Sequence, residues 1–146
     1  MAPPPLIFLS FLGLAALLDL LHPWLTGAPP ELRQGLAAEL GGLALPLILE
    51  AVRRFGRAGT NVKPWKPSTA LVLEGPYRYT RNPMYLAMLL LYMAGGLLLD
   101  TVYWVPLLAP LLLVMNRGVI QREERYLETL FGEEYRQFKG RVRRWL

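Results

Sequence analysis

Two long stretches of this sequence contain almost no charged side chains, and they constrain the fold more than any other feature. Residues 1–18 carry no charge, and residues 83–116 carry only Asp100. A helix that crosses the roughly 30 Å hydrocarbon core of a bilayer needs about 20 mostly apolar residues. The first stretch therefore indicates one membrane helix. The second indicates a hairpin of two helices that turns at Asp100.

The whole pattern predicts an all-α, polytopic membrane protein with a single domain over residues 1–146. We expect four spans, at residues 4–25, 36–53, 83–99 and 101–117. The second span is the weakest, because Glu39 and Glu50 flank its short uncharged core and Pro46 interrupts it. It either crosses the membrane, re-enters on the same face, or buries a polar face in the bundle.

Two cytoplasmic regions follow from this division of the chain. Residues 54–82 form a long loop, rich in Gly and Pro. Residues 118–146 form a charged tail, in which Leu127, Leu130, Phe131, Tyr135 and Phe138 recur at the spacing of an amphipathic helix. Gly132 is expected to divide that tail into two helical pieces.

Positive charge is concentrated in two blocks of the sequence. Fifteen of the 16 Lys and Arg residues lie within residues 53–81 and 117–144. Cytoplasmic loops of membrane proteins carry an excess of such residues. We therefore expect the loop, the tail and both termini on the cytoplasmic side, as four spans require. Basic blocks separated by hydrophobic runs do not indicate a nucleic-acid partner.

The most informative run is GPYRYTRNPMY, residues 75–85, which ends in the third expected span. Asn82 is a residue type that caps helices, and Pro83 suits the first helical position. The free N–H groups of a helix start, with Arg81 beside them, favour binding of a carboxylate or phosphate. A simple turn that contacts lipid headgroups explains the same run. The local pattern leaves both interpretations open.

A pair of acidic residues, Glu123 and Glu124, follows the last expected span. Carboxylates placed there could accept hydrogen bonds from a ribose diol or an ammonium group. The alternative is a solvated helix face paired with neighbouring arginines. With no cysteine and one histidine, His22, the sequence predicts neither a thiol nucleophile nor a metal site. It also lacks the GxGxxG, P-loop and GxSxG motifs.

Together, GTNVKPWKPSTALVLEGPYRYTRNPMY, the hydrophobic hairpin and EERYLETLFGEEYRQFKGRVRRWL resemble the isoprenylcysteine carboxyl methyltransferase family and the related phospholipid methyltransferases. The resemblance covers residues 56–146. It implies a pocket for S-adenosylmethionine, with S-adenosylhomocysteine as product, between the cytoplasmic helix ends and the tail. The residues that the resemblance implies for this pocket are Tyr77, Arg81, Asn82, Pro83, Tyr85, Glu123 and Glu124, with Arg81 and Glu124 as candidate catalytic residues. Asn82 stands where eukaryotic members have histidine.

The resemblance implies methyl transfer to a lipophilic, membrane-borne acceptor, either an isoprenylcysteine-like carboxylate or a lipid amine. In-line transfer from a sulfonium depends mainly on holding donor and acceptor in a dry, aligned arrangement. The aromatic faces of Tyr77 or Tyr85 would stabilise the sulfonium. Two alternatives remain. A small four-helix transporter would keep ionisable residues at mid-membrane, and an enzyme similar to the NADPH-dependent sterol reductases would need a nicotinamide site.

Overall fold

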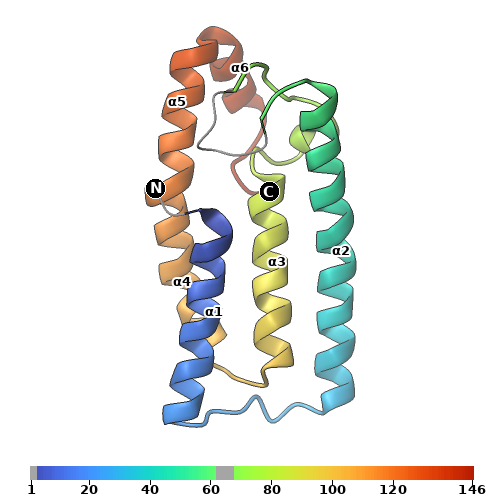
Figure 1. Ribbon diagram of the computed structural model, residues 1–146, viewed down its shortest axis with the longest axis vertical. Coiled ribbons are helices and arrows are strands. Elements are labelled where there is room, and N and C mark those ends of the chain that lie inside the picture. Colours follow the sequence, from blue (N-terminus) through green and yellow to red (C-terminus); the bar gives the residue numbers. More distant parts are fainter. Residues whose placement is uncertain (1–2, 62–67) are drawn as a thin grey trace.

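All regular elements in the described part of the chain, residues 3–61 and 68–146 of a computed structural model, are helices. In chain order they are α1 (Pro4–Leu21), α2 (Pro30–Arg57), the 3₁₀ turn η1 (Gly75–Arg78), α3 (Pro83–Leu98), α4 (Trp104–Val114), the π-helical segment η2 (Met115–Ile120), α5 (Gln121–Phe131) and α6 (Glu133–Arg141). Helices α1, α2, α3 and the α4–α5 column stand side by side, and α6 lies at one end of the bundle (Figure 1). The predicted all-α class is confirmed.

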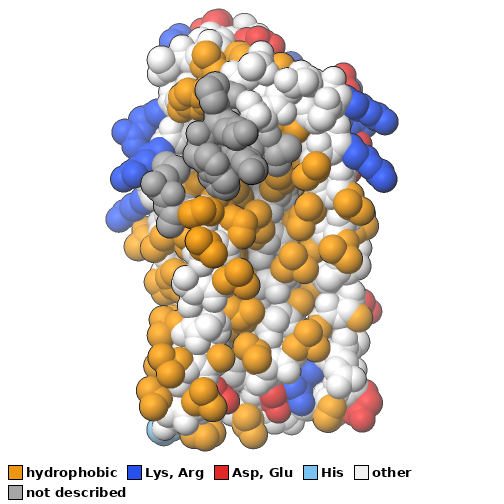
Figure 2. Space-filling view, viewed as in Figure 1, with side chains coloured by type: hydrophobic (Ala, Val, Ile, Leu, Met, Phe, Trp, Pro, Cys, Tyr) orange, Lys and Arg blue, Asp and Glu red, His pale blue; other side chains and the backbone are white. Residues whose placement is uncertain are grey.

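Among the described residues, three helices are long and apolar enough to cross a membrane. They are α1, α2 and the continuous helix Trp104–Phe131, which joins α4, η2 and α5. Helix α3 is also apolar but has only 16 residues, about 24 Å at 1.5 Å per residue. Hydrophobic side chains cover most of the length of the bundle, while Lys and Arg side chains project from both flanks near one end (Figure 2). These features fit an integral membrane protein.

Two helix boundaries differ from those expected. Helix α2 is a single helix of 28 residues rather than the interrupted segment 36–53, and Pro46 lies inside it. The last long helix continues to Phe131 rather than ending at residue 117, because the residues after α4 form a π-helix instead of leaving the helix. The predicted turn at Asp100 is confirmed, since α3 ends at Leu98 and Asp100 has a φ of 55°. Gly132, with the same φ, separates α5 from α6 as predicted.

The connections at the end remote from α6 are held by Asp100. Its Oδ1 accepts hydrogen bonds from the N–H and the hydroxyl of Thr26, and its Oδ2 lies 3.2 Å from Nη2 of Arg33. The Thr26 hydroxyl and the Arg33 charge hold the pKa of Asp100 below its ordinary value. This ion pair accounts for the one basic residue outside the two blocks, and it ties the α1–α2 connection to the α3–α4 turn.

Close packing between α3 and α4 depends on Gly96. A methyl group added there would overlap the Trp104 ring. We expect Gly96→Ala to lower the free energy of unfolding by about 1–3 kcal/mol, as overpacking in a filled core does. Gly41→Ala is the matched control, because nothing lies within 4 Å of a Cβ at that position in α2. Thermal melting of both variants in detergent checks this prediction. Equal melting temperatures for Gly96→Ala and Gly41→Ala would contradict the close approach of α3 and α4 at Gly96.

Candidate functional site

A cavity of about 70 Å³ lies beneath α6, where the start of α3, η1 and α5 meet. Its lining includes every residue that the sequence analysis assigned to a pocket, namely Tyr77, Arg81, Asn82, Pro83, Tyr85, Glu123 and Glu124. Ile120, Tyr135 and Phe138 add apolar and aromatic walls. The two sequence motifs, about 40 residues apart in the chain, thus share one site.

The start of α3 is fixed by the C-terminal end of the chain rather than by a helix cap. Pro83 occupies the helix start as predicted, but Asn82 makes no side-chain capping bond, so its predicted role as a cap is wrong. Its Nδ2 donates instead to the carbonyl of Arg144 at 2.9 Å. The Thr80 hydroxyl donates to the same carbonyl, and the Arg81 N–H donates to the carbonyl of Arg143. We call residues 143–145 the C-terminal strap.

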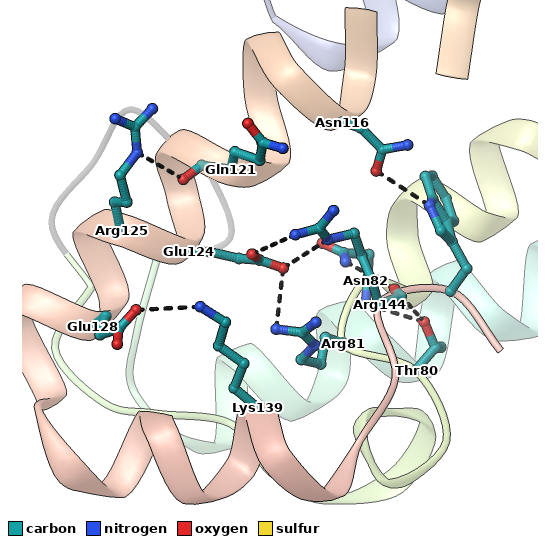
Figure 3. A network of polar contacts seen from close by, with 11 residues as sticks. Thr80, Arg81, Asn82, Asn116, Gln121, Glu124, Arg125, Glu128, Lys139 and Arg144 are labelled. Atoms are coloured by element: carbon teal, nitrogen blue, oxygen red, sulfur yellow. Dashed lines mark hydrogen bonds and ion pairs between the residues drawn. The ribbon is translucent and has the colours of Figure 1, made fainter. Parts of the chain in front are cut away.

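Glu124 lies between two arginines that come from distant parts of the chain (Figure 3). Arg144 donates from Nε to Oε1 at 2.9 Å and from Nη2 to Oε2 at 2.7 Å, a bidentate pair. Nη1 of Arg81 lies 3.1 Å from Oε1. Glu124 is only 6% exposed, so a solvated helix face is not its environment. The hydrogen bonds to Glu124 raise the pKa of Arg144.

Arg81 is buried next to this pair, yet part of its guanidinium is unused. Its side chain is 10% exposed. Within the described part of the chain, neither its Nε nor its Nη1 has a hydrogen-bond partner, since the approach of Nη1 to Glu124 is an ion pair without hydrogen-bond geometry. Buried polar atoms normally find partners because leaving one unpaired costs about 1–3 kcal/mol. Arg81 also lines the cavity, so its guanidinium is a candidate for binding a carboxylate.

The opposite side of the site combines a carboxylate with aromatic rings. The Tyr85 hydroxyl donates to Oε2 of Glu123 at 2.9 Å. The Tyr77 ring is 6% exposed and packs edge-on against Phe55. Burial, reinforced by the negative charge of Glu123, raises the pKa of Tyr77, so the phenol stays neutral at physiological pH. Burial likewise raises the pKa of Tyr135 to about 12. Burial also raises the pKa of Glu123, and the Tyr85 hydrogen bond opposes that shift. The cavity lining thus combines the guanidinium of Arg81 with the carboxyl group of Glu123.

Several contacting residues were missed by reasoning from the sequence. These are Thr80 and Arg144, which are described above, and Trp145, whose Nε1 donates to Oδ1 of Asn116 in the π-helical segment η2 at 3.2 Å. The terminal RVRRWL was interpreted only as part of a charged tail. The spacing of residue types in the sequence does not indicate these contacts, because the strap accepts hydrogen bonds through the backbone carbonyls of Arg143 and Arg144. π-helical turns are frequent at functional sites, but the π-helical segment η2 is visible only in the structure and not in the sequence.

Comparisons with known proteins agree with the resemblance noted in the sequence. A family model described as Phospholipid methyltransferase matches residues 32–134. An uncharacterized protein of Haemophilus influenzae is 47% identical over 64 residues, which are 43% of this chain and all of that protein. No solved structure matches the chain. Because the matched region spans most of the chain and contains both Arg81 and the Glu123–Glu124 pair, the chain belongs to the phospholipid methyltransferase family.

Proposed function

We propose that this protein transfers a methyl group from S-adenosylmethionine to a lipophilic acceptor in the membrane, a carboxylate or a lipid amine. Family membership supports methyl transfer, and the long apolar helices support a membrane location. The observation that carries the cofactor assignment is that two donors of buried Arg81 have no hydrogen-bond partner among the described residues, at a cavity that Glu123, Tyr77 and Tyr85 also line.

The residues present suit the chemistry of this cofactor. Arg81 would hold its carboxylate, and Glu123 would accept hydrogen bonds from its ammonium group or ribose hydroxyls. The rings of Tyr77 and Tyr85 would line the positively charged sulfur, which aromatic faces attract. When bound, the cofactor supplies an electrophilic methyl group, which leaves the sulfur as a neutral thioether when it moves to the acceptor.

The protein's own contribution is positioning and exclusion of water. Alignment of two reactants accounts for a large share of the barrier reduction in such transfers. Ile120 and Phe138 give the cavity apolar walls that keep water from the reacting groups. The site lies at the end of the apolar bundle, so the headgroup of a membrane lipid would approach it from the bilayer while its tail stays in the hydrocarbon.

Isothermal titration calorimetry of the protein in detergent tests the cofactor assignment. We expect S-adenosylmethionine and S-adenosylhomocysteine to bind with similar affinity, because the carboxylate, the ammonium and the ribose are common to both. NADPH should give no heat of binding. Binding of NADPH alone would favour the reductase alternative and would overturn this proposal.

We also propose that the site end of the bundle faces the cytoplasm. The basic flanks of that end support this orientation under the positive-inside rule. The chain has no cysteine, so single cysteines can be labelled without background. Ala58→Cys should resist an impermeant maleimide in intact cells, whereas Glu31→Cys, at the opposite end of α2, should react. Labelling at position 58 from outside would reverse the orientation.

A further inference from the structure

We propose that Arg144 is a positioning residue, which occupies both oxygens of Glu124 and so keeps the guanidinium of Arg81 free to bind a ligand carboxylate. The identity of that ligand rests on the proposed function. Arg144 lies beyond residues 32–134, the region that matches the family model. The role is therefore assigned by the geometry of this chain.

Glu124 accepts hydrogen bonds from Arg144 but forms only an ion pair with Arg81. Arg144 makes two hydrogen bonds, one to each carboxylate oxygen, at 2.9 and 2.7 Å. Arg81 approaches only Oε1, at 3.1 Å, and that contact lacks hydrogen-bond geometry. A buried guanidinium beside a carboxylate normally forms a two-pronged pair with it. Here Arg144 already holds that position, and Nε and Nη1 of Arg81 have no hydrogen-bond partner in the described part of the chain.

The strap is held so that Arg144 and Arg81 keep this relation. Hydrogen bonds from Thr80 and Asn82 to the Arg144 carbonyl lie on either side of Arg81 in sequence, and the Arg81 N–H is bonded to the preceding carbonyl of the strap. The Trp145 indole is anchored to Asn116 and packs against the main apolar core. The strap is thus bound to the start of α3 and to η2 by hydrogen bonds.

Loss of Arg144 has a specific consequence under this proposal. Glu124 would keep its charge and its burial but lose its two-pronged partner. Arg81, 3.1 Å away, would turn onto the carboxylate to replace it. The donors of Arg81 would then be consumed within the protein. A ligand carboxylate would have to compete with Glu124 for them, so its affinity would fall although Arg81 itself is unchanged.

Two probes separate this effect from general damage to the site. S-adenosylhomocysteine carries the amino-acid carboxylate, and 5′-methylthioadenosine lacks it. We expect Arg144→Ala to weaken S-adenosylhomocysteine binding about 10- to 100-fold, the range for loss of a charged hydrogen bond. Binding of 5′-methylthioadenosine should change about twofold or less. The matched control is Arg141→Ala, because exposed Arg141 bonds only to a backbone carbonyl of its own helix among the contacts described. It should bind both probes like the unmodified protein.

Arg144→Lys and a double variant test whether the affinity for S-adenosylhomocysteine changes in the direction that this mechanism predicts. Lysine keeps the positive charge but cannot form two hydrogen bonds to one carboxylate as arginine does. Arg144→Lys should therefore lose part of the affinity for S-adenosylhomocysteine, whereas a simple long-range charge effect predicts no loss of affinity. Arg144→Ala combined with Glu124→Gln removes the group onto which Arg81 collapses. That double variant should recover affinity for S-adenosylhomocysteine relative to Arg144→Ala alone. A purely structural role predicts the opposite, a double variant weaker than either single one.

The outcomes distinguish this inference from the function on which it rests. Equal losses for the two probes, no loss in Arg144→Ala, or no recovery in the double variant would overturn the role of Arg144 while leaving the cofactor assignment intact. An unmodified protein that binds neither probe would overturn the proposed function, and this inference with it. Thermal melting of each variant confirms that affinities are compared between folded proteins.

Discussion

Replacing Arg81 with lysine should lower affinity for S-adenosylhomocysteine by about 10- to 100-fold and methyl transfer by at least as much. Lysine preserves the positive charge that Glu124 needs at this buried position. It cannot, however, present the two guanidinium donors of this cavity-lining residue that have no hydrogen-bond partner among the described residues. The loss should therefore appear in ligand binding rather than in folding. Calorimetry at a temperature well below the melting transition measures it.

Arg78→Lys is the matched control for this prediction. Arg78 belongs to the same basic run but ends the turn η1 with an exposed side chain. It should bind S-adenosylhomocysteine with unchanged affinity. If Arg81→Lys and Arg78→Lys behaved alike, the guanidinium fork of Arg81 would play no part in holding the ligand. A loss of methyl transfer with unchanged cofactor affinity would instead place Arg81 on the acceptor.

Much of the architecture follows directly from the distribution of charge. A chain this short could not bury such long uncharged stretches inside a soluble fold, so they indicate membrane helices. Helix α1 and the hairpin around Asp100 were therefore predictable. The site was predictable for a different reason. Arg81 and the Glu123–Glu124 pair lie at similar distances in sequence on either side of the turn at Asp100, and an antiparallel hairpin places two such positions near the same end.

The parts that were not predicted depend on contacts distant in sequence. Asn82 has the right residue type and position for a cap, and nothing in its neighbourhood shows that a carbonyl 62 residues away takes its amide. The expected segment 36–53 followed the apolar residues, whereas α2 continues into polar residues at both ends, from Pro30 to Arg57. Near its C-terminal end Arg54 pairs with Glu50 one turn earlier in the same helix, a contact that suits a helix extending past residue 53.

The neighbouring carboxylates Glu123 and Glu124 should respond in opposite ways to the same substitution. Glu123→Gln keeps an oxygen that can accept the Tyr85 hydroxyl, so stability should change by only about 1 kcal/mol. The charge offered to a ligand ammonium or ribose diol is lost. A charged hydrogen bond contributes about 1.5–3 kcal/mol, so affinity for S-adenosylhomocysteine should fall about 10- to 150-fold.

Glu124→Gln should instead cost stability and spare the ligand. Both oxygens of Glu124 are engaged within the protein, and its loss leaves two arginine side chains, 10% and 30% exposed, without their counter-ion. Breaking a buried pair in this way costs about 3–5 kcal/mol, and the partial exposure of Arg144 favours the lower end. The donors of Arg81 remain available, so the folded fraction should still bind S-adenosylhomocysteine. Thermal melting and calorimetry are measured on both variants. If Glu123 contacts the ligand and Glu124 binds the two arginines, Glu123→Gln lowers mainly the affinity and Glu124→Gln lowers mainly the melting temperature. The reverse pattern, with affinity lost only in Glu124→Gln, would make Glu124 the ligand-binding carboxylate and Glu123 a partner of Tyr85 alone.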